Sequence, residues 1–137
     1  MVHGDVERLK EQVGCNAPAA EAEIRICNLK LRQNHLPELP IDFCEILKIS
    51  NGFSNEDCAV FGVQTGENKH FKDVAAFNVA YFHAREAKWL ILGENDFFYL
   101  IYDADRKKYH IAERDDLETT LSEDTVDEPL KAILRIE

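Results

Sequence analysis

Long hydrophobic runs, a basic charge excess and closely spaced cysteines are all missing from this 137-residue sequence. No window of 18 consecutive apolar residues occurs, so no segment is expected to span a bilayer. The first residues show no basic stretch followed by an apolar one, which argues against a signal peptide and favours a cytoplasmic protein. The four cysteines lie 12, 17 and 14 residues apart without a C-x-x-C pair, and we expect free structural thiols.

Motifs that bind phosphate or build a hydrolase site are also missing. Neither G-x-x-x-x-G-K-[ST], G-x-G-x-x-G nor G-x-S-x-G occurs. His83 and His110 each begin an H-x-x-E pattern, but the ligand set is incomplete for a closed metal site. Cys44 and His35 are a conceivable nucleophile and base, yet nothing nearby in the sequence would lower the thiol pKa. We therefore predict no catalytic residue, no metal and no cofactor.

Acidic residues outnumber basic ones by 26 to 16, which gives a net charge of −10. A negative field repels phosphate backbones, so nucleic acid is a disfavoured partner, whereas a basic protein is attracted. Between Glu113 and Glu128 eight acids accompany a single base, Arg114. This stretch is either a solvated face or a docking patch for a basic protein. On the second interpretation the partner-binding residues are Asp115, Asp116, Glu118, Glu123 and Asp124.

The overall composition predicts one globular domain over residues 1–137. Hydrophobic residues make up 45% and charged residues 31% of the chain, which is typical of folded proteins. A helix is expected at 18–33, where Ala20, Ile24, Cys27 and Leu31 recur at helical spacing and Pro18 suits the first position. Two further helices are expected, at 5–13 before Gly14 and at 40–50 before Asn51-Gly52.

The middle of the sequence changes to short apolar runs of strand length. Strands are predicted at 58–63, 89–93, 97–102 and 109–112, and residues 71–83 suggest a short helix. Asp103 to Lys107 supply turn residues for a hairpin, and Trp89 is expected in the core. Helical pieces are predicted near 115–121 and 127–135. The fold class is therefore α+β, with an antiparallel meander flanked by N-terminal and C-terminal helices.

The stretch from Leu36 to Phe53, LPELPIDFCEILKISNGF, resembles a known pattern. It is similar to the "LP … aromatic … L … NG" motif of the SUKH superfamily, and of its YrhA-like branch in particular. The later run ending in Leu92-Gly93, the next two strands and a final acidic helix follow the usual order of that superfamily. The resemblance covers about residues 20–134, while residues 1–17 remain unassigned. Phe53 stands where many members carry a second glycine.

The resemblance implies a SUKH-like fold and a non-enzymatic binding module. The superfamily groups bacterial immunity proteins, which neutralise toxins by direct binding, with fungal cell-wall synthesis regulators. The toxins are often basic nucleases, with which the acidic charge agrees. We therefore predict an immunity protein for a basic toxin domain. An intracellular adaptor with an endogenous protein partner is the alternative, and a small hydrolase or ligand-binding domain would need a deep pocket lined by His, Cys and carboxylates. The oligomeric state is left open.

Overall fold

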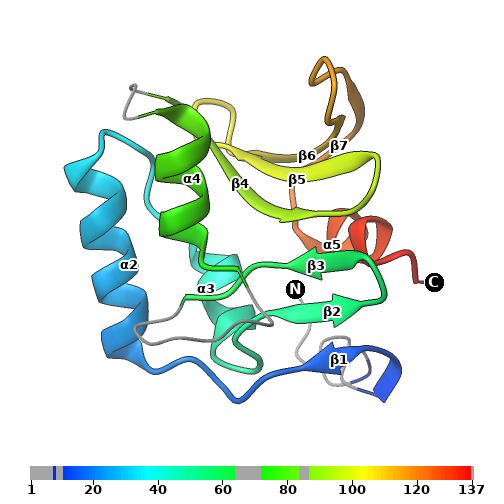
Figure 1. The fold of residues 1–137 in the computed structure, drawn as a ribbon, viewed down its shortest axis with the longest axis horizontal. Coiled ribbons are helices and arrows are strands. Elements are labelled where there is room, and N and C mark those ends of the chain that lie inside the picture. Colours follow the sequence, from blue (N-terminus) through cyan, green and yellow to red (C-terminus); the bar gives the residue numbers. More distant parts are fainter. Residues whose placement is uncertain (1–7, 9–10, 64–71, 84–86, 137) are drawn as a thin grey trace.

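The computed structural model describes residues 8, 11–63, 72–83 and 87–136. Within them the chain forms strands and helices in the order shown in Figure 1. The elements are β1 (Gly14–Cys15), α2 (Glu21–Gln33), α3 (Ile41–Leu47), β2 (Phe53–Asn55), β3 (Cys58–Val60), α4 (Val74–Phe82), β4 (Trp89–Glu94), β5 (Phe98–Asp103), β6 (Lys108–Glu113), β7 (Thr119–Glu123) and α5 (Asp127–Leu134).

The seven strands form one antiparallel sheet in which spatial order follows chain order, from β1 to β7. In Figure 1, α4 lies in front of the sheet beside β4 with α2 alongside it, while α3 and α5 lie behind. The predicted α+β class and meander are confirmed. No helix in the described part of the chain is long and apolar enough to cross a membrane.

The centre of the core is built by β4 and β5, the two most continuous apolar runs of the sequence. Leu90, Leu92, Leu100 and Ile101 are completely buried, because helices cover both faces of these strands. Trp89, at the start of β4, is only half-buried, although it packs against the core and its ring lies 6.1 Å from that of His110.

The sheet narrows between β3 and β4. The two strands pair only at Ala59 with Glu94 and at Val60 with Gly93, followed by one hydrogen bond from the Phe61 N–H to the Leu92 carbonyl. The chain then turns away from β4, and Gly62 forms a parallel bridge with Asp73 at the start of α4. This divergence leaves backbone groups of both segments without strand partners.

Two buried asparagines satisfy those backbone groups. Asn78 of α4 accepts the Ile91 N–H at 2.7 Å and donates to the Ile91 carbonyl at 2.8 Å. Asn51 does the same for Val63, at 2.6 and 2.7 Å. Each side-chain amide thus takes the place of a neighbouring strand. This stabilises the fold, because a buried peptide group without a hydrogen-bond partner lowers the free energy of unfolding.

The helix predicted at 18–33 begins three residues later, so Pro18 does not occupy its first position. The preceding residues are held in extended form: the Ala19 N–H donates to the Leu47 carbonyl, and the Ala17 carbonyl accepts from Asn51. Ala20 is the N-cap, and its N–H donates to the Glu23 carboxylate at 3.0 Å. The hydrogen bonds to Leu47 and Asn51 outweigh the preference of Pro18 for the first position of a helix.

The helix predicted at 40–50 is also shorter, because α3 ends at Leu47 with Lys48 as its C-cap. Asn51 and Gly52 are therefore not its cap. The Asn51 side chain instead reaches Val63, and Gly52 adopts a positive φ of 102° just before β2.

The helix predicted near 115–121 is wrong. Residues 114–116 form a turn, and Thr119–Glu123 form the edge strand β7, paired with β6. The β-branched pair Thr119 and Thr120 favours a strand, and Thr120 Oγ1 also donates to the Ile111 carbonyl. Leu117, at φ 59°, would interrupt a helix.

The strands β1 and β2 were not predicted; Cys15 pairs with Phe53 across them. The helix predicted at 5–13 falls mostly outside the described residues, of which 8, 11 and 12 are helical. The last predicted helix is confirmed as α5, from Asp127 to Leu134.

Candidate protein-binding surface

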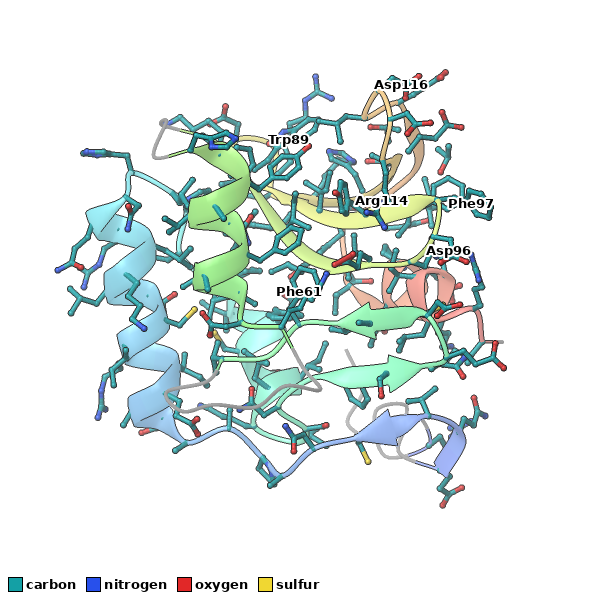
Figure 2. All side chains as sticks on the ribbon, viewed as in Figure 1. Phe61, Trp89, Asp96, Phe97, Arg114 and Asp116 are labelled. Carbon is teal, nitrogen blue, oxygen red and sulfur yellow. The ribbon has the colours of Figure 1, made fainter. Side chains whose placement is uncertain are left out.

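The turn between β6 and β7 carries the densest acidic group. Asp115, Asp116 and Glu118 are exposed, and Figure 2 places Asp116 at the tip of this hairpin, away from the rest of the molecule. An Asp116 carboxylate oxygen accepts the Glu118 N–H at 2.9 Å, which stabilises the turn. The charge of Asp116 and the loss of hydration, together with Glu118, raise the pKa of Glu113.

The five predicted partner-binding residues do not form one patch. Asp115, Asp116 and Glu118 lie in the turn, whereas Glu123 and Asp124 lie at the other end of β7. Glu118 and Glu123 are five positions apart along that strand, which corresponds to about 17 Å at the usual rise per residue. Asp124 forms an ion pair with Lys108 at 3.2 Å. The sequence stretch therefore supplies two acidic surfaces.

The carboxylates of Glu113, Asp116 and Glu118 lie close enough to ligate one cation, with their oxygens within 4.8 Å of one another. Exposed acidic groups of this kind are common without a bound ion, so we assign no metal site to this cluster.

A groove of about 760 Å³ opens on the side of the sheet where α3 begins. Its walls are the 37–40 loop, the first turn of α3, the end of β5 with the following turn, and Asp124. The groove therefore contains residues 37–42 of the sequence motif together with one residue of the predicted acidic patch. Ile41, the first residue of α3, lines it with 81% of its surface exposed.

A hydrogen bond from the Tyr109 hydroxyl to the Asp42 carboxylate fixes the floor of the groove. Tyr109 is almost completely buried on β6, and burial together with the Asp42 carboxylate raises the pKa of its phenol. Asp42 also accepts the Phe43 N–H at 3.1 Å. The start of α3 is thus attached to the sheet, and the groove is held in shape.

The turn between β5 and β6 is organised by Asp103, as its turn residues predicted. Its Oδ1 accepts the N–H groups of Asp105 and Arg106, at 3.1 and 3.2 Å, while Oδ2 lies 3.3 Å from His110 Nε2. Burial alone would raise the pKa of Asp103, but these hydrogen bonds outweigh it and the pKa is lowered.

The lowered pKa of Asp103 predicts a pH-dependent contribution to stability. The contribution is complete above the ordinary pKa of 3.8 and is lost as pH falls through the lowered folded-state value. We expect the free energy of unfolding to fall less steeply below about pH 4 in Asp103→Asn than in the unchanged protein. Urea titrations between about pH 7 and pH 2 test this, and parallel profiles would contradict it.

Burial disfavours the thiolate form of Cys27 and Cys44. All four cysteines are free. Burial raises the pKa of Cys27 to about 12, and burial also raises the pKa of Cys44. The Cys44 Sγ faces the Leu39 carbonyl at 4.0 Å. A neutral Cys44 thiol is not the nucleophile that a pairing with His35 would need.

Comparisons with known proteins add no relative: no protein-family model and no curated protein matches this sequence.

Sequence reasoning found the acidic residues of the β6–β7 turn from their charge, although it placed them on a helix, and it missed the groove. Ile41 was a visible signal, because it lies outside the apolar face made by Phe43, Ile46 and Leu47. Tyr109 gave no such signal, since its contact with Asp42 joins residues 67 positions apart.

Proposed function

We propose that this chain is a non-enzymatic protein-binding domain of the SUKH type, an immunity protein that neutralises a basic toxin domain by binding it directly. The observation that carries the proposal is the exposed acidic hairpin, with Asp115, Asp116 and Glu118 at its tip and only Arg114 beside them. Such a surface accelerates the approach of a cationic protein and weakens with salt.

The side-chain chemistry supports binding over catalysis. The Cys44 thiol is neutral, and His110 and Asp103 are both buried, at 4% and 5% exposure, and are used within the fold. The acidic groups, by contrast, face outward. The mechanism we propose is steric occlusion of the toxin, with long-range attraction setting the association rate.

Coexpression tests the proposed function. We expect a neighbouring gene to encode the toxin, and that toxin domain is produced in a bacterial host with and without this chain. We expect growth only when the chain is present, and a complex of the two purified proteins. Continued toxicity together with no complex would overturn the proposal.

The same complex tests the acidic turn. We expect Asp115→Asn combined with Glu118→Gln to slow association about two- to five-fold at low salt, with a smaller effect at high salt. The Asp116 hydrogen bond to the backbone is retained in this variant. The matched control is Glu56→Gln with Asp57→Asn, which removes the same charge from the exposed β2–β3 turn. Stopped-flow rates that are equal for both variants would contradict a role for the acidic turn.

A further inference from the structure

The groove beside α3 combines apolar and acidic surface within one helical turn. Ile41 and Glu45 are four residues apart and share a face of α3, with Asp42 next to them. We infer that this groove docks an extended basic segment of the partner protein, in which a lysine or arginine lies next to an apolar side chain. The inference rests on the proposed function and adds where the partner protein contacts this chain and which side chains it uses.

The apolar part of the groove is exposed as it stands. A single exposed isoleucine is ordinary on a protein surface. Ile41, however, lines a concavity together with Pro37, Pro40 and the half-buried ring of Tyr102. An apolar side chain placed there would remove surface from water on several sides at once, which is how small anchors contribute to binding.

The charged part of the groove selects a cation. Its lining holds four carboxylates and one ammonium group: Glu38, Asp42, Glu45, Asp124 and Lys107. Arg32 already pairs with Glu38 at 3.0 Å, and Lys108 with Asp124 at 3.2 Å. Within the described chain, Asp42 and Glu45 have no cationic partner. A lysine or arginine of the ligand would meet this uncompensated charge directly beside Ile41.

Two other prominent exposed features, Phe97 and the β6–β7 turn, lack this combination. Phe97 is 67% exposed in the β4–β5 hairpin, but the guanidinium of Arg135 already lies 5.9 Å from its ring centre and 3.8 Å from Asp96. The β6–β7 turn is acidic, yet Leu117, its one apolar side chain, packs against the core. Unlike these two features, the groove offers both contacts in one concavity.

Peptide titrations followed by NMR test the inference on the full chain. The probe is acetyl-Gly-Lys-Leu-Lys-Gly-amide; its comparisons replace Leu by Ser, or both Lys by Glu. We expect saturable shift changes at Ile41, Asp42 and Glu45 with the first peptide, weaker binding of the Ser peptide and none of the Glu peptide. Ile41→Ser should weaken binding about ten-fold and Glu45→Gln about three-fold. The matched controls, Ile26→Ser on α2 and Glu56→Gln in the β2–β3 turn, should leave it unchanged.

Three outcomes would overturn the groove as the docking site. Shift changes confined to residues 113–118 and weakened by Asp115→Asn would place basic ligands on the acidic turn, leaving the proposed function intact. Shifts of the groove residues that depend on protein concentration without peptide would show that a second copy covers it. Equal binding of the Ser and Leu peptides would exclude an apolar anchor. Failure of the toxin experiment, by contrast, bears on the proposed function itself.

Discussion

Replacing Asn78 by alanine is expected to lower the free energy of unfolding by about 3 kcal/mol. Asn78 is fully buried, and its amide is the partner of both the N–H and the carbonyl of Ile91. Alanine leaves these two groups buried without a partner, at about 1–3 kcal/mol each before any relaxation. Urea unfolding followed by the fluorescence of Trp89, the single tryptophan, measures the loss.

The matched control for Asn78 is Asn34. Both side chains donate to the carbonyl four residues earlier at 2.8 Å, Asn78 to Val74 and Asn34 to Lys30. The Asn34 hydrogen bond is exposed, and its side chain pairs with no strand backbone. Asn34→Ala should therefore lower the free energy of unfolding by less than about 1 kcal/mol. Similar losses in the two variants would show that the link to Ile91 contributes nothing.

The second large effect is expected for Gly62→Ala, with a loss of about 3 kcal/mol. A Cβ at Gly62 would lie 2.6 Å from the Asn51 carbonyl oxygen and equally close to its side-chain oxygen. The carbonyl belongs to the backbone and cannot rotate away, so Asn51 must move, and its two bonds to Val63 are disturbed with it. Urea unfolding of the variant measures the loss of stability.

Gly14→Ala is the control for this steric argument. There the nearest atom is the Ser54 hydroxyl oxygen, at 2.7 Å, and this side chain is free to change rotamer. We expect a loss below about 1 kcal/mol. If Gly62→Ala and Gly14→Ala were equally stable, the loop carrying Asn51 would be able to move away from the added Cβ at little cost in free energy, which would contradict the steric argument.

The parts of the fold that could be predicted depend on local pattern. The strands β4 and β5 appear in the sequence as apolar runs, β6 as a shorter run interrupted by His110, and α2 as a stripe from Ile24 through Cys27 to Leu31. Their side chains are buried wherever the element packs, so periodicity alone indicates both the element and its buried face.

The parts that could not be predicted depend on distant partners. β1 has two residues and β2 three, too few for a pattern, and they exist because Cys15 meets Phe53 across the sheet. β7 is polar and exposed, so its acids suggested a solvated helix. The groove needs Asp42 and Tyr109 together, and no local signal encodes that contact.

The two edges of the sheet differ in how they limit self-assembly. β1 offers only two residues to an approaching strand, which is too little for stable pairing. β7 is longer but carries Glu123, has an irregular register near Ile111 and continues from the acidic turn. A second copy approaching β7 would bring like charges together along an uneven ladder. Amyloid-like stacking at either edge is therefore disfavoured, and the acidity of the hairpin protects the chain from its own copies.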